Sequence, residues 1–353
     1  MLAVGRGGAT RRMRPISNPP NPWLSTHVEY LDEPPPAELR VYEELAQSAL
    51  AENDSPDVGF RWSVNPYRGC QHACAYCYAR PSHQYLGFGA GTDFESRIVV
   101  KTNVHERLAL ELARPSWKRE LVAFSGNTDC YQPLEASYGL TRRCLEVCLA
   151  RRTPVGVITK GTLVRRDLDL LAELARGPGA RVHVSIPFLD ERVGRAIEPG
   201  APSPRRRLET LKLLAEAGIE TGVALAPIVP GLNESDIAGI LEAARAAGAT
   251  RAFMTLLRLP AEVLPVFRER LAQAFPERVR KVENGLREMK LGAWNRSTFG
   301  LRMRGSGPRW EALERLFEIQ CRRLGFDRGA ARRPAERQGE LFSPSGGRPD
   351  GLP

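Results

Sequence analysis

Short apolar runs and longer amphipathic segments alternate through the middle of this 353-residue chain, and this alternation constrains its fold more than any other feature. The short runs are typical of buried strands, whereas the longer segments repeat apolar residues with helical spacing. Strands are expected at residues 61–65, 121–126, 155–159, 182–188, 222–228 and 251–257. Helices are expected at residues 104–114, 138–151, 168–176, 205–217 and 236–247.

Strands and helices that alternate in this way are typical of parallel βα units, which form a doubly wound sheet or a barrel. Six units are too few to close an eight-stranded barrel, so a partial barrel is the alternative to a Rossmann-type sheet. No G-x-G-x-x-G motif follows any expected strand, and no G-x-x-x-x-G-K motif is present. The sequence therefore gives no sign of a phosphate-binding loop for nucleotides.

The two ends of the chain have a different composition from its middle. Residues 1–55 are rich in Pro, Arg, Gly and Asn and are expected to be mostly disordered, apart from a helical pattern at 37–51. Residues 330–353 are expected to be a second disordered tail. Between the tails, residues 56–260 would form the barrel, and residues 261–329 would form a helical, basic extension that packs on it.

Three of the seven cysteines lie within eight residues, directly after the first expected strand. Cys70, Cys74 and Cys77 form a C-x3-C-x2-C motif inside a segment that we call the cysteine loop, residues 65–78. An odd number of clustered cysteines indicates a metal site in a reducing compartment better than a disulfide framework. The sequence has neither a signal peptide nor an apolar run of about 18 residues, so we expect a cytoplasmic protein without membrane contact.

Three thiolates with no fourth cysteine at metal spacing restrict the kind of metal site. Structural zinc prefers four closed ligands, and a zinc site here would need His72, His83 or Cys130 to complete it. A four-iron cluster held by three thiolates instead keeps one iron open for a chelating substrate. A third interpretation is that the cysteines are neighbours in a core loop without any metal.

The motif C-x3-C-x-aromatic-C after the first strand resembles that of the radical S-adenosylmethionine (SAM) enzymes, and the resemblance spans about residues 60–260. It implies a six-stranded partial (βα) barrel of the α/β class, with Cys70, Cys74 and Cys77 as ligands of a [4Fe–4S] cluster. It also implies that the open iron binds the methionine end of SAM and that Tyr76 lines the adenine. Reductive cleavage of SAM would then yield a 5′-deoxyadenosyl radical.

Ligands of a parallel barrel gather at the carboxyl ends of its strands, so we examined the polar residues there. The segment from Ser125 through Gly126 and Asn127 to Asp129 stands in place of the Gly-Gly-Glu that holds the SAM amino group in the family, and Asn127 or Asp129 could hold that group here. By the same resemblance, the SAM carboxylate, ribose and adenine would meet Lys160, Ser185 and Ile228, respectively. Lys160 could equally be solvated, and Ser185 could bond to backbone.

The basic run at residues 205–207 opens a helix, where arginines are electrostatically unfavourable. This misfit indicates contact with an anion, and Arg205 is the candidate.

The segments 64–101, 127–133 and 158–160 resemble the spore photoproduct lyase-related branch of the family, whose members are often labelled DNA repair photolyases. Lesion repair is therefore what the branch implies. Spore photoproduct lyase returns a hydrogen atom from a cysteine, so Cys130, just past the second strand, is the candidate donor here. Cys144, Cys148 and Cys321 are interpreted as buried apolar residues on helices.

Nucleic acid is also indicated by the charge, which is +10. With 45 arginines and six lysines, a GC-rich genome is an alternative explanation. Residues 287–337 concentrate the excess, with thirteen basic and six acidic side chains. Aromatic residues and arginines interleave at 294–299 and 302–310, as in a groove that follows a strand. The alternative is a cap over the barrel with core aromatics and a solvated basic face.

Two protein partners are expected. Gln338, Leu341 and Phe342 form a segment similar to the Q-x-x-L-F peptides that dock on the replication sliding clamp. A cluster of this kind also needs an electron donor such as flavodoxin or ferredoxin.

The sequence thus predicts a radical SAM enzyme that acts on nucleic acid, with DNA as the partner and lyase-like lesion repair as the implied activity. The alternatives are the same chemistry on a peptide or small molecule, and a non-catalytic, zinc-stabilised nucleic-acid-binding protein.

Overall fold

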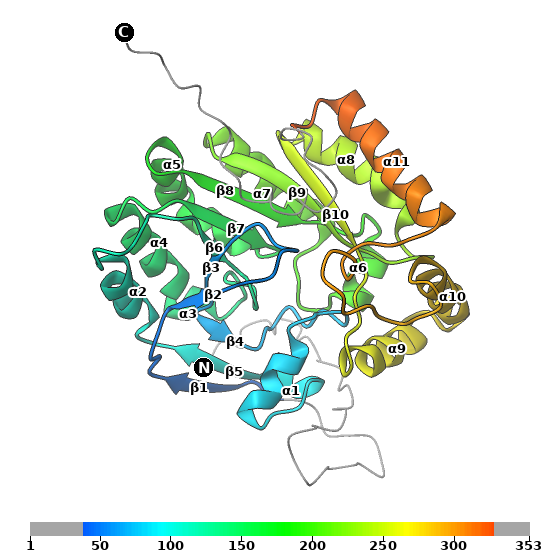
Figure 1. The fold of residues 1–353 in the computed structure, drawn as a ribbon, viewed down its shortest axis with the longest axis horizontal. Helices are drawn as coiled ribbons and strands as arrows, with labels where there is room; N and C mark the ends of the chain where they lie inside the picture. The colour runs from blue at the N-terminus through cyan, green and yellow to red at the C-terminus, as the bar shows by residue number, and fades with distance from the viewer. Residues whose placement is uncertain (1–37, 328–353) are drawn as a thin grey trace, which may run out of the picture.

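The computed structural model describes residues 38–327, which form one large sheet, one small sheet and the helices around them (Figure 1). The large sheet has the strand order β10-β9-β8-β7-β6-β3-β2. Six of its strands are parallel. They follow one another across the sheet in the order in which these six occur along the chain. They are β3 (Trp62–Val64), β6 (Val122–Phe124), β7 (Val155–Thr159), β8 (Ala180–Ser185), β9 (Glu220–Ile228) and β10 (Arg251–Leu256). The predicted partial barrel of six parallel strands is confirmed.

Five predicted helices connect these strands and cover the sheet on its outer side (Figure 1). They are α2 (Val104–Leu112), α4 (Leu140–Ala150), α5 (Leu168–Arg176), α7 (Pro204–Glu216) and α8 (Ile237–Ala246). Apolar side chains of the strands and helices share one continuous core, in which Val157, Val184 and Leu211 are fully buried. Burial of each such side chain contributes about 2 kcal/mol to the stability of the fold. This packing holds the strand ends, which carry the polar residues, in place. Cys144, Cys148 and Cys321 are buried, as predicted.

A small three-stranded sheet with the order β1-β5-β4 was not expected. It consists of β1 (Arg40–Glu44), β5 (Arg97–Lys101) and β4 (Tyr67–Arg68). Strand β1 is parallel to β5, and β4 is antiparallel to it. Because β4 directly precedes Cys70, this sheet holds the start of the cysteine loop.

The expected helix at 37–51, within a disordered tail, is wrong where the structure describes it. Residues 38–55 contain β1 and also β2 (Leu50–Glu52), which is antiparallel to β3. Backbone N–H groups of Ala49 and Leu50 donate to the carboxylate of Glu111, at 3.0 and 2.8 Å. These long-range hydrogen bonds override the local helical pattern. The remaining expected tail segments, 1–37 and 330–353 with the residues 338–342, lie outside the described residues.

After β10 the chain forms three further helices, α9 (Val263–Ala274), α10 (Val279–Met289) and α11 (Pro308–Leu324). Helix α11 lies against α8, and α9 packs on α6 (Glu191–Ile197) (Figure 1). Two short elements, the 3-10 helix η1 (Arg80–Leu86) and α1 (Thr92–Ser96), follow the cysteine loop. No helix between residues 38 and 327 is both long enough and apolar enough to span a membrane.

Candidate metal centre

The three thiols of the cysteine loop lie close together. Cys70 and Cys74 are almost completely buried, Cys77 is half-buried and packs against Cys70, and all three are free. Burial raises the pKa of the Cys70 thiol, and the charges of Asp129, Cys77 and Cys74 raise it further. Each cysteine of the loop therefore lies within electrostatic reach of the others.

Metal ligation requires thiolates, and cations beside the loop favour them. Burial raises the pKa of the Cys74 thiol to about 12, although Lys160 and Arg207 oppose this increase. Burial likewise raises the pKa of the Cys77 thiol, and Arg80 and Lys160 counteract it. The positive charges thus lie where they would stabilise metal-bound sulfur.

The donor set fits a multi-iron cluster better than a single ion. Within residues 38–327, no three His, Cys, Asp or Glu side chains converge closely enough to hold one metal ion. His72 Nδ1 lies 3.1 Å from Asp129 Oδ2, and His83 Nε2 lies 2.8 Å from the backbone oxygen of Arg97. Both candidate histidines thus have partners within the protein, whereas a four-iron cluster with one open iron requires only the three thiolates.

Two glutamines clamp the beginning of the cysteine loop to the segment that follows β6. Gln132 Nε2 donates to the backbone oxygen of Gly69 at 3.1 Å, and its Oε1 accepts from the backbone N–H of Gln71 at 3.0 Å. Gln71 Oε1 in turn accepts from the backbone N–H of Leu134 at 2.8 Å. These reciprocal bonds hold the backbone on both sides of Cys70 against the segment that follows β6.

The fully buried guanidinium of Arg80 holds the second half of the loop. It donates twice to the backbone oxygen of Cys74, at 3.0 and 2.8 Å, and also to the backbone oxygens of Ala90 and Gly91. Its charge is paired with the Glu95 carboxylate. A buried arginine with partners for all these donors fixes the backbone more firmly than loop residues alone could.

The loop after α6 passes directly against the cysteine loop. Gly200 N–H donates to the backbone oxygen of His72 at 3.0 Å, and Ala75 N–H donates to that of Ile197 at 2.9 Å. A Cβ atom on Gly200 would come within 1.9 Å of the Gln71 backbone oxygen. Only glycine fits at this position without displacing the cysteine loop.

Asp129 links the cysteine loop to the end of β7. Its Oδ1 accepts from Thr159 Oγ1 at 2.6 Å, and its Oδ2 accepts from the Lys160 backbone N–H at 2.7 Å and faces His72 Nδ1. Burial would raise the pKa of this carboxyl, but His72 and the hydrogen bonds hold it well below its usual range. Because its oxygens are occupied, Asp129 acts as a positioning residue and not as a ligand for an ammonium group.

The other residues after β6 lie beside the end of the cysteine loop. Tyr78 hydroxyl donates to the backbone oxygen of Gly126 at 2.7 Å. Asn127 N–H donates to Asn65 Oδ1 at 2.8 Å, and Ser125 Oγ accepts from the Cys130 N–H at 2.9 Å. Backbone and amide oxygens of this segment thus lie next to the half-buried side of the cysteines.

A buried ionic cluster joins four elements at the carboxyl ends of the strands. Lys160 Nζ, after β7, lies 3.8 Å from Glu198 Oε1 and 5.7 Å from the centre of the Tyr76 ring. Tyr76 hydroxyl donates to Glu198, whose other oxygen pairs with Arg207. Arg207 also donates to the backbone oxygen of Ser185 at 3.0 Å. The expected residues Tyr76, Lys160 and Ser185 are therefore brought together, through two residues that sequence reasoning missed.

Arg205 is not brought to this cluster. Its side chain is 79 % exposed and lies 3.8 Å from Glu209 on the outer face of α7. The basic run does reach the site, but through Arg207, which shares a helix face with Leu211 and Leu214. That i, i+4, i+7 spacing was the signal that could have identified it. No comparable signal marked Glu198.

Cys130 is fully buried in the apolar core, which contains Cys144 as well as Cys74 and Tyr76, and its backbone oxygen accepts from Thr141 Oγ1 on α4 at 2.7 Å. This placement argues against a direct hydrogen-atom donor. Ile228 is fully buried at the end of β9, where its backbone oxygen accepts from the Leu257 N–H at 2.9 Å.

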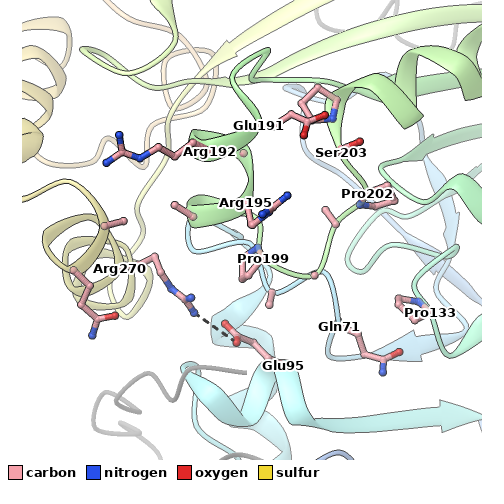
Figure 2. A pocket seen from close by; sticks show the side chains of 18 of the residues that line it. Gln71, Glu95, Pro133, Glu191, Arg192, Arg195, Pro199, Pro202, Ser203 and Arg270 are labelled. Atoms are coloured by element: carbon pink, nitrogen blue, oxygen red, sulfur yellow. Dashed lines mark ion pairs between the residues drawn. The ribbon is translucent and has the colours of Figure 1, made fainter. Parts of the chain in front are cut away.

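A cavity of about 890 Å³ borders the outer side of the cysteine loop (Figure 2). Gln71 and Ala73 of the loop form one wall, and α6 and α9 contribute the others. Figure 2 shows Arg192, Arg195 and Arg270 around this cavity, with Arg270 directed toward Glu95 at 3.9 Å. Residues next to Cys70 and Cys74 in sequence thus line a cavity that several arginines also line.

Comparison with known proteins agrees with this geometry. The sequence model of a family described as the Radical SAM superfamily matches residues 64–244. An uncharacterized protein of Mycobacterium tuberculosis is 43% identical over 246 residues, which cover 68% of this chain and 72% of that protein. A protein named radical SAM Nalpha-GlyT isomerase, from Pseudomonas phage M6, is 27% identical over 234 residues, 65% of this chain and 46% of its own.

Among solved structures, a mutant of spore photoproduct lyase with bound AdoMet and dinucleoside spore photoproduct is similar, with a TM-score of 0.58. The match covers 80% of this chain and 79% of that one, at 16% sequence identity. At this identity, the similarity establishes only that the two chains share a fold.

Proposed function

Because this chain belongs to the radical SAM superfamily, we propose that Cys70, Cys74 and Cys77 ligate its [4Fe–4S] cluster and that it cleaves SAM to act on a nucleic acid. The protein is a radical SAM enzyme, and its cofactors are the cluster and SAM. The observation that carries the residue assignment is the C-x3-C-x2-C motif after β3, whose three cysteines lie within electrostatic reach of one another, with Lys160 near Cys74. Membership of this enzyme family argues against the alternative of a non-catalytic zinc protein.

When bound, the reduced cluster supplies one electron that splits SAM into methionine and a 5′-deoxyadenosyl radical. The chain's own residues prepare this site. Lys160 presents a buried ammonium group for the SAM carboxylate, and Glu198 and Tyr76 hold that group in place. Oxygens of the segment 125–127 are available to the SAM amino group. Asp129 and Gln132 keep this segment and the cysteine loop in fixed register.

A nucleic-acid substrate is supported by three observations. The related solved structure contains a dinucleoside spore photoproduct, and the phage relative is named for Nalpha-GlyT isomerisation. The described C-terminal extension also presents cations beside aromatic rings, with Arg302 at 4.5 Å from the Phe299 ring centre. Within this proposal, lesion repair by a lyase-like reaction on DNA is the specific activity.

An acidic one-electron donor such as flavodoxin or ferredoxin is the proposed redox partner. Its approach is supported by the cavity of Figure 2, where exposed Arg192 and Arg195 lie near Gln71 and Ala73 of the cysteine loop. Complementary charge accelerates encounters between such proteins. The proposed compartment is the reducing cytoplasm, where cysteines that form no disulfide, like those of the described chain, persist as thiols. Docking to the sliding clamp through residues 338–342 stays a prediction.

The test is anaerobic reconstitution with iron and sulfide, followed by reduction with dithionite in the presence of SAM. We expect about four iron atoms per chain and formation of 5′-deoxyadenosine. Oligonucleotides with damaged or modified thymines should stimulate turnover, with deuterium exchanged between substrate and 5′-deoxyadenosine. Zinc as the sole bound metal, or no 5′-deoxyadenosine with several reductants, would contradict the proposal. Stimulation by peptides alone would instead exclude the nucleic-acid substrate.

A further inference from the structure

The segment between α10 and α11, residues 290–307, bridges the two ends of the row of six parallel strands. At one end, the Leu256 N–H of β10 donates to the backbone oxygen of Met303 at 3.0 Å. At the other end, Arg302 bonds to Ser55 and pairs with Asp57, shortly before β3. The bridge therefore closes the lateral opening of the partial barrel, beside Tyr78 of the cysteine loop.

Four cations gather along this bridge. Lys290 is fully buried, and its Nζ is 3.4 Å from the backbone oxygen of Arg302. Burial lowers the pKa of Lys290 to about 8, and the charges of Arg258 and Arg296 contribute to this decrease. Burial and the charge of Arg302 also lower the pKa of Arg258. Arg258, Lys290, Arg296 and Arg302 are thus electrostatic neighbours.

Lys290 is fully buried and the three arginines are half-buried, yet these cations have fewer carboxylate partners than the buried arginines elsewhere in the described chain. Arg80 is paired with Glu95, and Arg207 is paired with Glu198. By contrast, Arg302 with Asp57 is the one ion pair of the cluster among residues 38–327, and Arg258 Nε is buried there without a hydrogen-bond partner. Buried positive charge without a counterion is costly. Positive charges that lack counterions are expected where a bound ligand supplies the missing negative charge.

Aromatic rings identify the kind of anion. The Phe299 ring is 54% exposed beneath the guanidinium of Arg302, and Trp294 lies between Arg268 and Arg287, 5.4 and 6.0 Å from its centre. Arginines beside exposed rings are typical of surfaces that bind a nucleic-acid strand, because phosphates pair with guanidinium groups and bases stack. An acidic peptide would pair with the arginines, but it would have no bases to stack on the aromatic rings.

We propose that Arg258, Arg296 and Arg302, with Lys290 behind them, form a binding site for a phosphodiester group of a nucleic-acid strand at the lateral opening. The inference rests on the proposed function, because this binding site would hold the substrate strand beside Tyr78 and the proposed metal centre. The excess positive charge is then part of substrate binding and is neutralised only in the complex.

The test measures binding of a fluorescent single-stranded 12-mer DNA to the full-length chain over a salt series. Arg258→Gln and Arg296→Gln are each expected to weaken binding about tenfold, for every base sequence, and to reduce the salt-dependence slope by about 1. The matched control is Lys212→Met, because Lys212 lies on α7 and is paired with Glu216 at 3.7 Å. Its binding should equal that of the wild type. An acidic peptide of equal charge should not compete.

A second measurement separates binding from stability. Lys290→Met removes one charge of a repelling cluster, so its melting temperature without DNA should be equal to or above that of the wild type, while DNA stabilises it less. Unchanged DNA affinity in Arg258→Gln and Arg296→Gln would overturn the proposal, as would equal competition by the peptide. If Arg258→Gln fails to fold, Arg296→Gln decides. SAM cleavage without DNA is measured on the wild type and on Lys212→Met. A wild type that binds DNA as expected but fails to cleave SAM would refute the proposed function alone.

Discussion

His72 Nδ1 lies 3.1 Å from Asp129 Oδ2, and this contact joins a residue between two of the cysteines to the segment after the neighbouring strand. The same carboxylate accepts from the backbone N–H of Lys160 at 2.7 Å. One carboxylate therefore sets the spacing between the proposed cluster ligands and the cation proposed to bind SAM.

Asp129→Asn should lower the free energy of unfolding by about 3 kcal/mol at pH 7, because buried donors lose a charged partner. The pKa of Asp129 is depressed in the folded state, so its stabilisation is complete above the unfolded value of about 4 and is lost as the pH falls through the folded value. The difference between the variant and the wild type should therefore shrink below about pH 4. Urea unfolding at several pH values measures it.

The control for this prediction is Asp169→Asn. The pKa of Asp169 is also lowered, to about 2, by hydrogen bonds from Arg142, but its side chain is 67% exposed. Solvent screens such a pair, so the loss should be less than about 1 kcal/mol. Equal losses for the two variants would refute the special role of Asp129.

Cys70→Ala, Cys74→Ala and Cys77→Ala should each abolish the iron-dependent absorption of the reconstituted protein. Three thiolates are the minimum set that holds a four-iron cluster with one open iron. Cys321→Ala is the matched control, because this buried cysteine lies on α11 and should retain full iron content. Iron and sulfide analysis measures both. Full iron content in any of the three loop variants would exclude that cysteine as a ligand.

Gly200→Ala should impair iron incorporation although it changes no proposed ligand. Its Cβ would lie 1.9 Å from the Gln71 backbone oxygen, so the cysteine loop must move. In Gly194→Ala, on α6, the new Cβ meets only Pro204 Cγ and Cδ, at an ordinary 3.8 and 3.9 Å, and incorporation should be normal. Comparable iron content in the two variants would show that the loop tolerates displacement.

Lys160→Met should weaken SAM binding by about tenfold or more with unchanged iron content, because a buried ammonium group is lost and the cysteines are not altered. Lys160→Arg should restore part of the affinity. The exposed Lys118→Met variant provides the control. Equilibrium dialysis of reconstituted protein with SAM gives the dissociation constants. Wild-type affinity in Lys160→Met would assign the SAM carboxylate to another group.

Cys130→Ala should retain SAM cleavage and product formation, because this residue is fully buried in the apolar core and its backbone is bonded to Thr141 on α4. The expected cost is a loss of stability of about 1 kcal/mol from the small cavity. Loss of product with normal 5′-deoxyadenosine formation would restore Cys130 as hydrogen donor. Product analysis by mass spectrometry distinguishes these outcomes.

The predicted elements were those whose pattern is local. Six strands and five helices follow from hydrophobic periodicity, and the cysteine loop follows from spacing alone. Strands β1 and β4 depend on pairing with β5 across long sequence separations, and no local pattern reports such pairing. The β-branched run of β5 itself, with Ile98, Val99 and Val100, was a signal that went unused.

The site residues differ in the same way. Lys160 and Ser185 follow strands whose direction is predictable, so their position at the strand ends was predictable too. Which side of a loop a residue faces depends on packing, and for this reason Cys130 was assigned to the site although it lies in the core. Glu198 lies on a loop whose course depends on the contact of Gly200 with the cysteine loop.

Strand β4 has only two residues, and β5, its one strand neighbour among the described residues, pairs with β1 on its other side. Residues from before and after the cysteine loop in sequence thus form a small sheet beside the segment that leads into Cys70. A chain shortened to begin at β2 would keep all six parallel strands and every proposed ligand. It would lose one of the two neighbours of β5, whereas contacts of β4 with the segment after β6, such as Thr128 Oγ1 with the Tyr67 backbone oxygen, would remain. The barrel can therefore keep its strands while the approach to Cys70 loses part of its support.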